Sequence, residues 1–596
     1  MIVPMTKYSF VLLNGQQEGL LEQLQELGLM DITRSVKPVD ETSQKIAAEM
    51  DLIKGLIQGL QKAEIPEETQ PATLPEDDDL VRLAGGTLML YTDTQEQIKG
   101  LQKEVNARKV WGSFDREMVH RLADAGVPLH FHKLGAKLYK EEWEQEYVLS
   151  VIAHEKDGVY FVVAGEDPLP GEIPAPSGDA AQAESSLKGK ESFLHQLEAE
   201  IMALRQHIPE LEARMKAETA RLDLYLADKS AVPAAENTIV TLVGYAPTDK
   251  DTEVTQALER TGVYYLKDAA TVEDNPPIQL KNNWFVRQFE TLTDMYGRPD
   301  YNEFDPTPYL SIFFLLFFAM CMGDAGYGLM LIIAGILLKK VDSFKDLAPL
   351  VTILGTGTFV VGIVMHTFFG VDISALSWIP SWLKAVMITG TIAGFEAQMV
   401  LALVIGIVHL CLAMVVKTVY ATRNQGFLGS LGTWGWTLLI VGGVVVGTLA
   451  MMSLVPPEIT KWIVIVLGIV SALGIFLFND IKRNPLKNIG AGLWETYNTV
   501  TGLLGDVLSY LRLYALGLAG GMLGKAFNDI ASMTLGDGSF GIGWLAFAVI
   551  LIIGHALNLA MCCLGAFVHP LRLNFLEFFK NSGYDGKGRN YRPVKK

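Results

Sequence analysis

One arginine in the middle of an apolar stretch constrains this chain more than any other feature of its sequence. Residues 495–522 read ETYNTVTGLLGDVLSYLRLYALGLAGGM and carry Arg512 near their middle. The stretch is long enough to cross a bilayer. An arginine at the centre of a membrane helix costs roughly 2.5–3.5 kcal/mol or more. Because packing does not require such a charge, the sequence predicts that Arg512 works in a polar cavity.

The last apolar stretch, residues 554–580, repeats this arrangement. Six of its residues follow one another at steps of three and four, which places them on one face of a helix: they are His555, Asn558, Cys562, Gly565, His569 and Arg572. Two membrane helices that each carry a buried arginine indicate an ion path between them. For Arg572, which is nearer the end of its stretch, snorkelling to a lipid headgroup is the alternative.

The chain changes character near residue 300. The first part is charged and holds most of the net charge of −17, so a nucleic-acid partner is not expected. From residue 308 on, apolar runs follow one another. The four cysteines lie in this second part without the spacing of a metal site. We expect no signal peptide, no nucleotide-binding motif and no cofactor, and a cytoplasmic N-terminal half.

Two similar segments of the soluble half predict one small α/β lobe. Residues 7–13, 16–27 and 30–33 have the pattern of a strand, a helix and the start of a second strand, and 238–246, 250–260 and 263–266 repeat it. The two units pair most simply into a single lobe of the split βαβ type, made of residues 1–40 and 235–275.

A rod is predicted between these segments. Apolar residues repeat with heptad spacing, most clearly at Leu194, Leu197, Ile201, Leu204, Ile208, Leu211 and Met215. We expect an antiparallel coiled coil of residues 42–110 and 186–230, which Pro209 bends or interrupts. A second lobe, residues 85–180, would contain strands at 87–91, 146–152 and 159–163. The fold class is therefore an α+β soluble domain, residues 1–300, followed by an all-α membrane domain, residues 301–596.

Charge placement decides how many times the chain crosses the membrane. Hydropathy marks seven apolar blocks, and the first, residues 308–338, contains GDAGYG in its middle. Splitting this block into two helices puts every basic loop on the cytoplasmic side with the N-terminal domain, as the positive-inside rule requires. The result is about eight crossings, with both termini cytoplasmic. Asp324 at the split is interpreted as a cap or turn former rather than an ion ligand.

Other polar residues of the membrane half are candidates for the ion path. Asn498, Gly505 and Arg512 share one helix face by heptad spacing, and glycines near Arg512 permit close approach of another helix. Near helix ends, His366, His409, Glu396 and Gln398 are more often interfacial than part of a pathway. The candidates for ion translocation are Arg512, Arg572, His555, Asn558, His569, Asn498, Ser509, Glu495 and Glu577.

Several motifs resemble one known family. GDVLSYLRLYALGLA at 505–519, GHALNLAMCCLGAFVHPLRLNFLEFF at 554–579 and FDPTPYLSIFFLLFFAMCMGDAGYG at 304–328 resemble the membrane subunit of rotary V/A-type ATPases, which is called subunit a or subunit I. WGSFDREMVHRLADAG at 111–126 and TIVTLVGYAP at 238–247 are similar to its cytoplasmic domain. The likeness covers the whole chain, and its compact length is similar to prokaryotic members.

The resemblance implies a mechanism. A ring of proteolipid c/K subunits turns against this protein, and Arg512 meets each ring carboxylate between two offset half-channels; Arg572 matches the family's second arginine. Some eukaryotic members have a glutamate where this chain has Cys562 and a histidine where it has Gly520. The half-channels here would therefore rely on His555, Asn558 and His569.

The family also implies partners and a location. Peripheral stalks of E/G-type subunits and a central stalk with a C/d-type subunit would bind the soluble half, and the catalytic headpiece would be reached only indirectly. The chain itself would be a non-catalytic, multi-pass subunit in the cell membrane. Two other classes remain open: a secondary transporter, which would typically show an internal repeat, and a membrane-anchored signalling protein.

Overall fold

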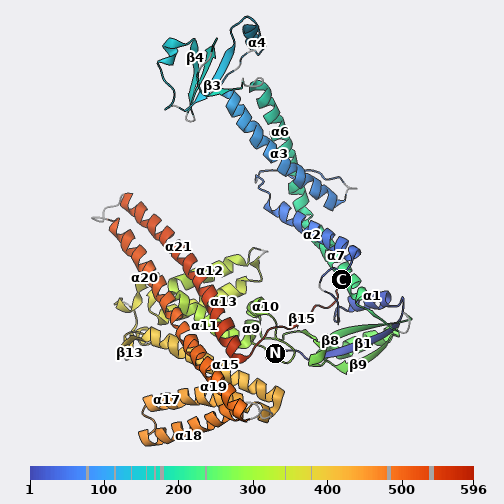
Figure 1. Ribbon diagram of the computed structural model, residues 1–596, viewed down its shortest axis with the longest axis vertical. Coiled ribbons are helices and arrows are strands. Elements are labelled where there is room, and N and C mark those ends of the chain that lie inside the picture. The colour runs from blue at the N-terminus through green and yellow to red at the C-terminus, as the bar shows by residue number, and fades with distance from the viewer. Residues whose placement is uncertain are drawn as a thin grey trace. The chain divides into compact units, whose positions relative to one another are not determined.

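The computed structural model (Figure 1) describes residues 1–595 except for 36, 67, 76–78, 113, 115, 136, 156–157, 167–168, 175–179, 235–237, 342–343, 378, 393, 479–484 and 536–541. It divides into two compact units. The first comprises Met1–Val11, Leu29–Ile32 and Val243–Pro593, and the second comprises Leu12–Gly28, Thr33–Leu242 and Val594–Lys596. Two basic residues of one loop that the orientation argument counts, Lys482 and Arg483, lie outside the described residues.

The two predicted strand–helix–strand segments do form one sheet. Its order is β2-β8-β1-β9, with β7 (Val232–Ala234) on β8. The strands are β1 (Met5–Leu13), β2 (Asp31–Ile32), β8 (Ile239–Pro247) and β9 (Tyr264–Ala269). The helices are α1 (Gln17–Leu27) and α8 (Asp251–Thr261), which end at Gly28 and Gly262 in the left-handed conformation. Glycine adopts this conformation without the Cβ clash that other residues meet.

The rod consists of four helices that pack in pairs. Helix α2 (Glu41–Lys62) packs on α7 (Ile208–Lys229), and α3 (Leu80–Lys109) packs on α6 (Ala180–Gln206), as Figure 1 shows. The pairs run antiparallel, because the residue numbers of contacting partners increase along one member of a helix pair as they decrease along the other. The contacts that show this join Asp40 to Tyr225, Thr87 to Glu200 and Lys109 to Glu184. The predicted interruption is confirmed, since α6 ends at Gln206 and Pro209 lies in the first turn of α7.

The predicted strand at 87–91 is wrong, because this segment lies inside α3. Its threonine and tyrosine suit a strand by propensity, whereas its leucines and methionine favour a helix. Tertiary packing overrides that preference: buried side chains of α3 recur at helical spacing, at Val81, Ala84, Thr87, Tyr91, Thr94 and Ile98.

A second sheet lies within the second unit. Its order is β4-β5-β3-β6, formed by β3 (Leu129–Leu134), β4 (Leu149–Glu155), β5 (Gly158–Ala164) and β6 (Glu172–Ile173). The short helices are α4 (Arg116–Asp124) and α5 (Trp143–Glu146). The predicted strands at 146–152 and 159–163 correspond to β4 and β5, although β4 begins only at Leu149.

The membrane half is helical. Five described helical stretches are long and apolar enough to cross a membrane: Ala397–Gly429, Leu431–Met451, Pro457–Phe476, Leu486–Met533 and Gly543–Ser582. In Figure 1 they correspond to α15 (Ala397–Gly429), α16–α17 (Leu431–Thr437 and Gly443–Met451), α18 (Pro457–Phe476), α19–α20 (Pro485–Ser509 and Leu511–Met533) and α21 (Ile542–Arg572) with its π-helical extension Leu573–Phe579. Three shorter apolar helices precede them, namely α11 (Thr307–Met322), α12 (Ala325–Leu338) and α13 (Ala348–Val364).

The first apolar block is two helices, as predicted, and Asp324 is a cap. Helix α11 ends at Gly323, whose φ is +58°, and α12 begins two residues later. The fully buried Asp324 carboxylate accepts hydrogen bonds from the backbone N–H groups of Gly326 and Tyr327 at 2.8 and 3.3 Å. It also accepts from Phe369 and Gly370 at 2.8 and 2.7 Å, so it joins α12 to the turn after α13.

The stretch around Arg512 is interrupted. Helix α19 ends at Ser509 and α20 begins at Leu511, so Arg512 lies in the first turn of α20. The residue between them, Tyr510, is fully buried, and its hydroxyl lies 2.9 Å from Nδ1 of His409 on α15.

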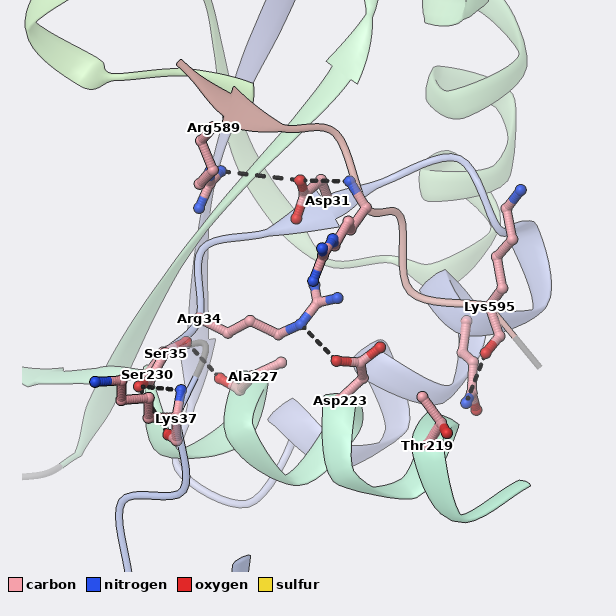
Figure 2. A network of polar contacts seen from close by, with 12 residues as sticks. Asp31, Arg34, Ser35, Lys37, Thr219, Asp223, Ala227, Ser230, Arg589 and Lys595 are labelled. Carbon is pink, nitrogen blue, oxygen red and sulfur yellow. Dashed lines mark hydrogen bonds and ion pairs between the residues drawn. The ribbon is translucent and has the colours of Figure 1, made fainter. Parts of the chain in front are cut away.

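The C-terminal segment returns to the lobe of the first unit. Strand β15 (Arg589–Asn590) pairs with β10 (Pro277–Ile278) in parallel register. Figure 2 shows Asp31 between Arg589 and the backbone of Arg592. Asp31 Oδ2 lies 4.0 Å from Arg589 Nη2 and accepts a 3.0 Å hydrogen bond from the backbone N–H of Arg592. Within the second unit, Arg34 Nε donates to Asp223 at 3.0 Å.

Candidate functional site at the interface of helices α20 and α21

The predicted polar face of α21 packs against α20. A Cβ placed on Gly520 of α20 would lie 2.7 Å from Cys562 Sγ, and one placed on Gly565 of α21 would lie 4.0 Å from Leu516. Gly517 of α20 lies against α11 instead, where an added Cβ would meet the Met320 carbonyl oxygen at 2.6 Å. The predicted close approach is therefore confirmed at Gly517 and Gly520. At Gly505 a Cβ would have no described atom within 4 Å, so close approach there stays a prediction.

A hydrogen-bonded group brings two predicted residues together, and we call it the Tyr327 network. The hydroxyl of Tyr327 on α12 lies 2.8 Å from His555 Nδ1 and accepts a 2.8 Å hydrogen bond from Asn558 Nδ2. His555 Nε2 lies 3.0 Å from Asn528 Oδ1 of α20, and Asn558 also donates to the Gly520 carbonyl at 2.9 Å. The network links α12, α20 and α21 through groups that can pass or hold a proton.

Arg512 lies on the other side of this interface, toward the start of α20. Its side chain is half-buried, and Nη1 is fully buried without a hydrogen-bond partner among the described residues. Cys321 of α11 and His569 of α21 are close enough to interact with it electrostatically. His569 Nδ1 is likewise buried without a described partner. A buried guanidinium nitrogen without an acceptor among the described residues is costly, while the remainder of this half-buried side chain stays accessible.

A second polar group surrounds Glu577, whose side chain is 3% exposed. Glu577 lies near the Ser509 hydroxyl, with Asp506, Arg572 and Arg512 in its electrostatic surroundings. Asp506 accepts a 2.8 Å hydrogen bond from Asn581 and lies 3.8 Å from Lys580 Nζ. The acidic groups therefore come from α19 and from the π-helical segment after α21, beyond the end of the α20–α21 interface that is opposite the Tyr327 network.

The expectation of a buried Arg572 is wrong for the chain by itself. The Arg572 side chain is exposed. Glu495 is half-buried and Asn498 is exposed, both on α19, and neither belongs to the two polar groups described above.

Sequence reasoning missed the contributions of Tyr327 and Asn528. Tyr327 lies in GDAGYG, and 228 residues separate it from His555. A phenolic hydroxyl inside an apolar block was the available signal, since a buried tyrosine usually finds a partner. His409, one of the less favoured candidates, stacks on Phe578 with ring centroids 4.6 Å apart, and its Nδ1 forms a hydrogen bond with the Tyr510 hydroxyl. It packs in the aromatic core of the membrane half.

Among the described residues no three His, Cys, Asp or Glu side chains gather as a metal site, and all four cysteines are free. The chain thus combines a helical membrane half with a helical soluble part. In the membrane half, the Tyr327 network and the Glu577 group lie near Arg512, whose Nη1 has no hydrogen-bond partner among the described residues. These features are typical of a membrane protein that carries a helical domain outside the bilayer.

Comparison with known proteins agrees. The model of the V-type ATPase 116kDa subunit family matches residues 179–361. The chain is 32% identical to "A-type ATP synthase subunit I" of Pyrococcus abyssi, over 59% of this chain and 53% of that protein. It is 30% identical to "A-type ATP synthase subunit I" of Methanocaldococcus jannaschii, over 70% and 64%. The chain thus spans between half and two thirds of the length of these archaeal relatives.

A bacterial relative matches from end to end. "V-type ATP synthase subunit I 1" of Treponema pallidum is 25% identical, with 100% of both chains covered. The chain belongs to the V-type ATPase 116kDa subunit family, as a subunit a or subunit I of a V/A-type ATPase.

Proposed function

We propose that this chain is the stationary membrane subunit of its ATPase, and that it forms two ion half-channels against a rotating proteolipid ring. In this role it couples the passage of protons or sodium ions to ATP hydrolysis or synthesis. The observation that carries the proposal is the buried Nη1 of Arg512, which lacks a described acceptor in a helix with an exposed apolar face. A carboxylate on each ring subunit would pair in turn with the accessible part of this half-buried side chain.

The chemistry follows from electrostatics. A fixed guanidinium stabilises the ionised form of a passing carboxylate and so promotes release of its ion. It also repels cations and so opposes leakage between the half-channels. The Tyr327 network and the Glu577 group lie toward opposite ends of the α20–α21 interface, which suits two offset access routes.

The soluble half suits a stator that must not turn with the ring. We propose that its antiparallel helix pairs act as a coiled coil and that its two lobes bind the elongated stalk subunits. The membrane half would cross the bilayer about eight times with both termini in the cytoplasm, as the described basic residues Lys339, Lys340, Lys417 and Arg423 require by the positive-inside rule.

Substitution of Arg512 tests the proposal. In the assembled complex, reconstituted in vesicles, Arg512→Ala should abolish ATP-driven ion uptake. Arg512→Lys should do so as well, because lysine keeps the charge but lacks the planar fork of donors. Arg572→Lys is the matched control and should be milder, since the exposed Arg572 can remain hydrated. A native gel checks assembly, which removal of a desolvated charge should leave intact.

The competing class, a coiled-coil-anchored secondary transporter, makes different predictions. Such a protein would purify alone, whereas a stator would co-purify with ring and stalk subunits. Near-normal uptake by assembled Arg512→Ala complexes would remove this residue from the mechanism and favour the competitor.

A further inference from the structure

Strand β2, at one edge of the first sheet, is only two residues long. It pairs with β8 through Asp31 and Ile32. Strands in folded proteins usually have about five or six residues. An edge strand also leaves backbone groups unpaired, which other chains can use. A strand as short as β2 is therefore expected to depend on contacts from outside its own sheet.

Residues 588–595 supply such contacts, and we call them the strap. Tyr591 donates its hydroxyl hydrogen to the Leu29 carbonyl oxygen at 2.6 Å. The backbone N–H of the next residue, Arg592, donates to the Asp31 carboxylate at 3.0 Å (Figure 2). Asp31 is buried, with 3% of its surface exposed. The strap therefore holds both the chain just before β2 and the first residue of β2 itself.

The strap is closely packed as well as hydrogen-bonded. Val594 is fully buried, and a Cβ on Gly28 would lie 3.4 Å from Lys595 Cγ. Gly588 lies so close to the backbone of Pro299 that an added Cβ would come within 1.8 Å of the Pro299 carbonyl oxygen. Contacts of this kind are typical of a packed interior, whereas surface loops are usually mobile. The strap thus has one fitted position.

The strap is synthesised long after the strand that it holds. Every strand of the first sheet precedes Gly297, and 287 residues separate Gly297 from Tyr584, which lies just before the strap. At about 5–20 residues per second, synthesis over this distance takes roughly 15–60 s, whereas small domains fold in seconds or less. The sheet therefore has time to form while β2 still lacks the strap.

The strap can reach its position from one side of the membrane only. Its strand β15 pairs with β10, which precedes α11 and all the apolar helices of the membrane half. Paired strands lie on the same side of a membrane, so the chain between β10 and β15 must cross it an even number of times. A chain with one crossing too many or too few would place the strap on the opposite side.

We propose that the strap is a check on membrane insertion, because it completes the lobe only when the preceding helices cross the membrane an even number of times. A correctly inserted chain docks the strap at Leu29 and Asp31. A chain with a misplaced helix keeps β2 unsupported, so this edge of the lobe opens locally and becomes accessible to proteases. The inference goes beyond the proposed function and does not depend on what the membrane half transports.

The first test moves the strap across the membrane. A leucine–alanine span of about 20 residues, inserted between Lys587 and Gly588, adds one crossing. A glycine–serine insert of the same length is the matched control, because a flexible linker keeps the strap at a high effective concentration near its site. In both chains, labelling of Lys595→Cys with an impermeant thiol reagent reports on which side the strap lies.

The measurement is hydrogen exchange at the backbone of β2, followed by mass spectrometry on chains kept in lipid vesicles. We expect exchange at Asp31 and Ile32 to be about tenfold faster or more with the leucine–alanine span, since local opening no longer has to displace the strap. The glycine–serine insert should leave exchange close to the parental rate. Equal exchange in the two chains, with their straps labelled on opposite sides, would overturn the proposal.

The second test weakens the strap without changing the membrane crossings. Tyr591→Ala removes the hydrogen bond to Leu29, and Lys587→Ala, at an exposed residue just before the strap, is the matched control. Tyr591→Ala should accelerate exchange at β2 several-fold and leave β5 of the second sheet at the parental rate, and Lys587→Ala should change neither strand. Unchanged exchange at β2, or equal acceleration at β2 and β5, would show that the strap does not specifically support β2.

Discussion

Gly520 and Cys562 lie directly opposite one another where α20 packs on α21, and a Cβ on Gly520 would come within 2.7 Å of Cys562 Sγ. These are the two positions at which the resemblance described above led us to expect a difference from some eukaryotic members. Because the two residues touch, the departures form one local change. Small side chains let the two helices pack closely, and the polar groups lie about one turn away at Asn558 and two turns away at His555.

The Tyr327 hydroxyl should matter for transport. Tyr327→Phe leaves His555 Nδ1 without its partner and removes one of two acceptors from Asn558. An unmade buried hydrogen bond costs about 1–3 kcal/mol, so we expect roughly tenfold slower ion uptake with normal assembly. Uptake by reconstituted complexes is the measurement, and Tyr497→Phe, an exposed tyrosine on α19, is the control. Equal rates for both variants would make the network a packing feature only.

Close packing at Gly517 should make this position intolerant of any side chain. The Cβ of Gly517→Ala would lie 2.6 Å from the Met320 carbonyl oxygen, a backbone atom that cannot rotate away. We expect a loss of about 1–3 kcal/mol in stability. Gly505→Ala meets nothing described within 4 Å and should be neutral or slightly stabilising. Thermal unfolding of the detergent-solubilised chain compares the two, and a Gly517→Ala melting temperature at or above that of Gly505→Ala would contradict the packing.

Acid should destabilise the lobe that contains β1. The Lys7 ammonium donates a hydrogen bond to Asp274, which lowers the pKa of that carboxyl from its ordinary value of 3.8 to about 2. The folded pKa is the lower one, so the contribution is fully present above pH 3.8 and is lost as the pH falls toward 2. Asp274→Asn should lower the melting temperature at pH 6 and flatten its dependence between pH 4 and 2. Glu273→Gln changes the exposed neighbour and should retain the parental pH dependence of the melting temperature. If Glu273→Gln also flattens this dependence, the Lys7–Asp274 ion pair is not its cause.

Membrane orientation can be tested with two exposed valines. A cysteine at Val341, beside Lys340, should be protected from an impermeant reagent in intact cells, and one at Val371 in the hairpin β11–β12 (Thr367–Phe368 and Val371–Asp372) should react. Val341 is 47% and Val371 46% exposed, so accessibility in the chain does not distinguish them. The reverse labelling pattern would show that the basic loops do not face the cytoplasm.

Much of the fold could be predicted because its signals are local. Gly28 and Gly262 end helices where a left-handed residue is needed, and Pro209 interrupts the rod where its ring cannot continue a helix. The strand expected at 87–91 fails for the opposite reason. Its outcome depends on α6, about one hundred residues away, whose surface buries Thr87 and Tyr91.

The candidate site also has parts that the sequence predicts and parts that it does not. Helical spacing predicted that His555, Asn558 and Cys562 share a face, because the spacing lies within one helix. The same sequence could not show that Tyr327 completes the group, since no periodicity links α12 to α21. Nor could it show that Arg572 is exposed, because the number of neighbours around a helix face depends on how every other helix packs.

The pairing of β15 with β10 gives the membrane half two attachments to the same lobe. One is the chain from β10 into α11, and the other is the chain from α21 back to Arg589, with Gly588 also bridged to Arg298. The membrane helices between these two connections are therefore held to the lobe at both ends. A load on α21 is shared by two connections in parallel, and peeling the membrane half from the lobe requires breaking the strand pair as well as stretching the linker.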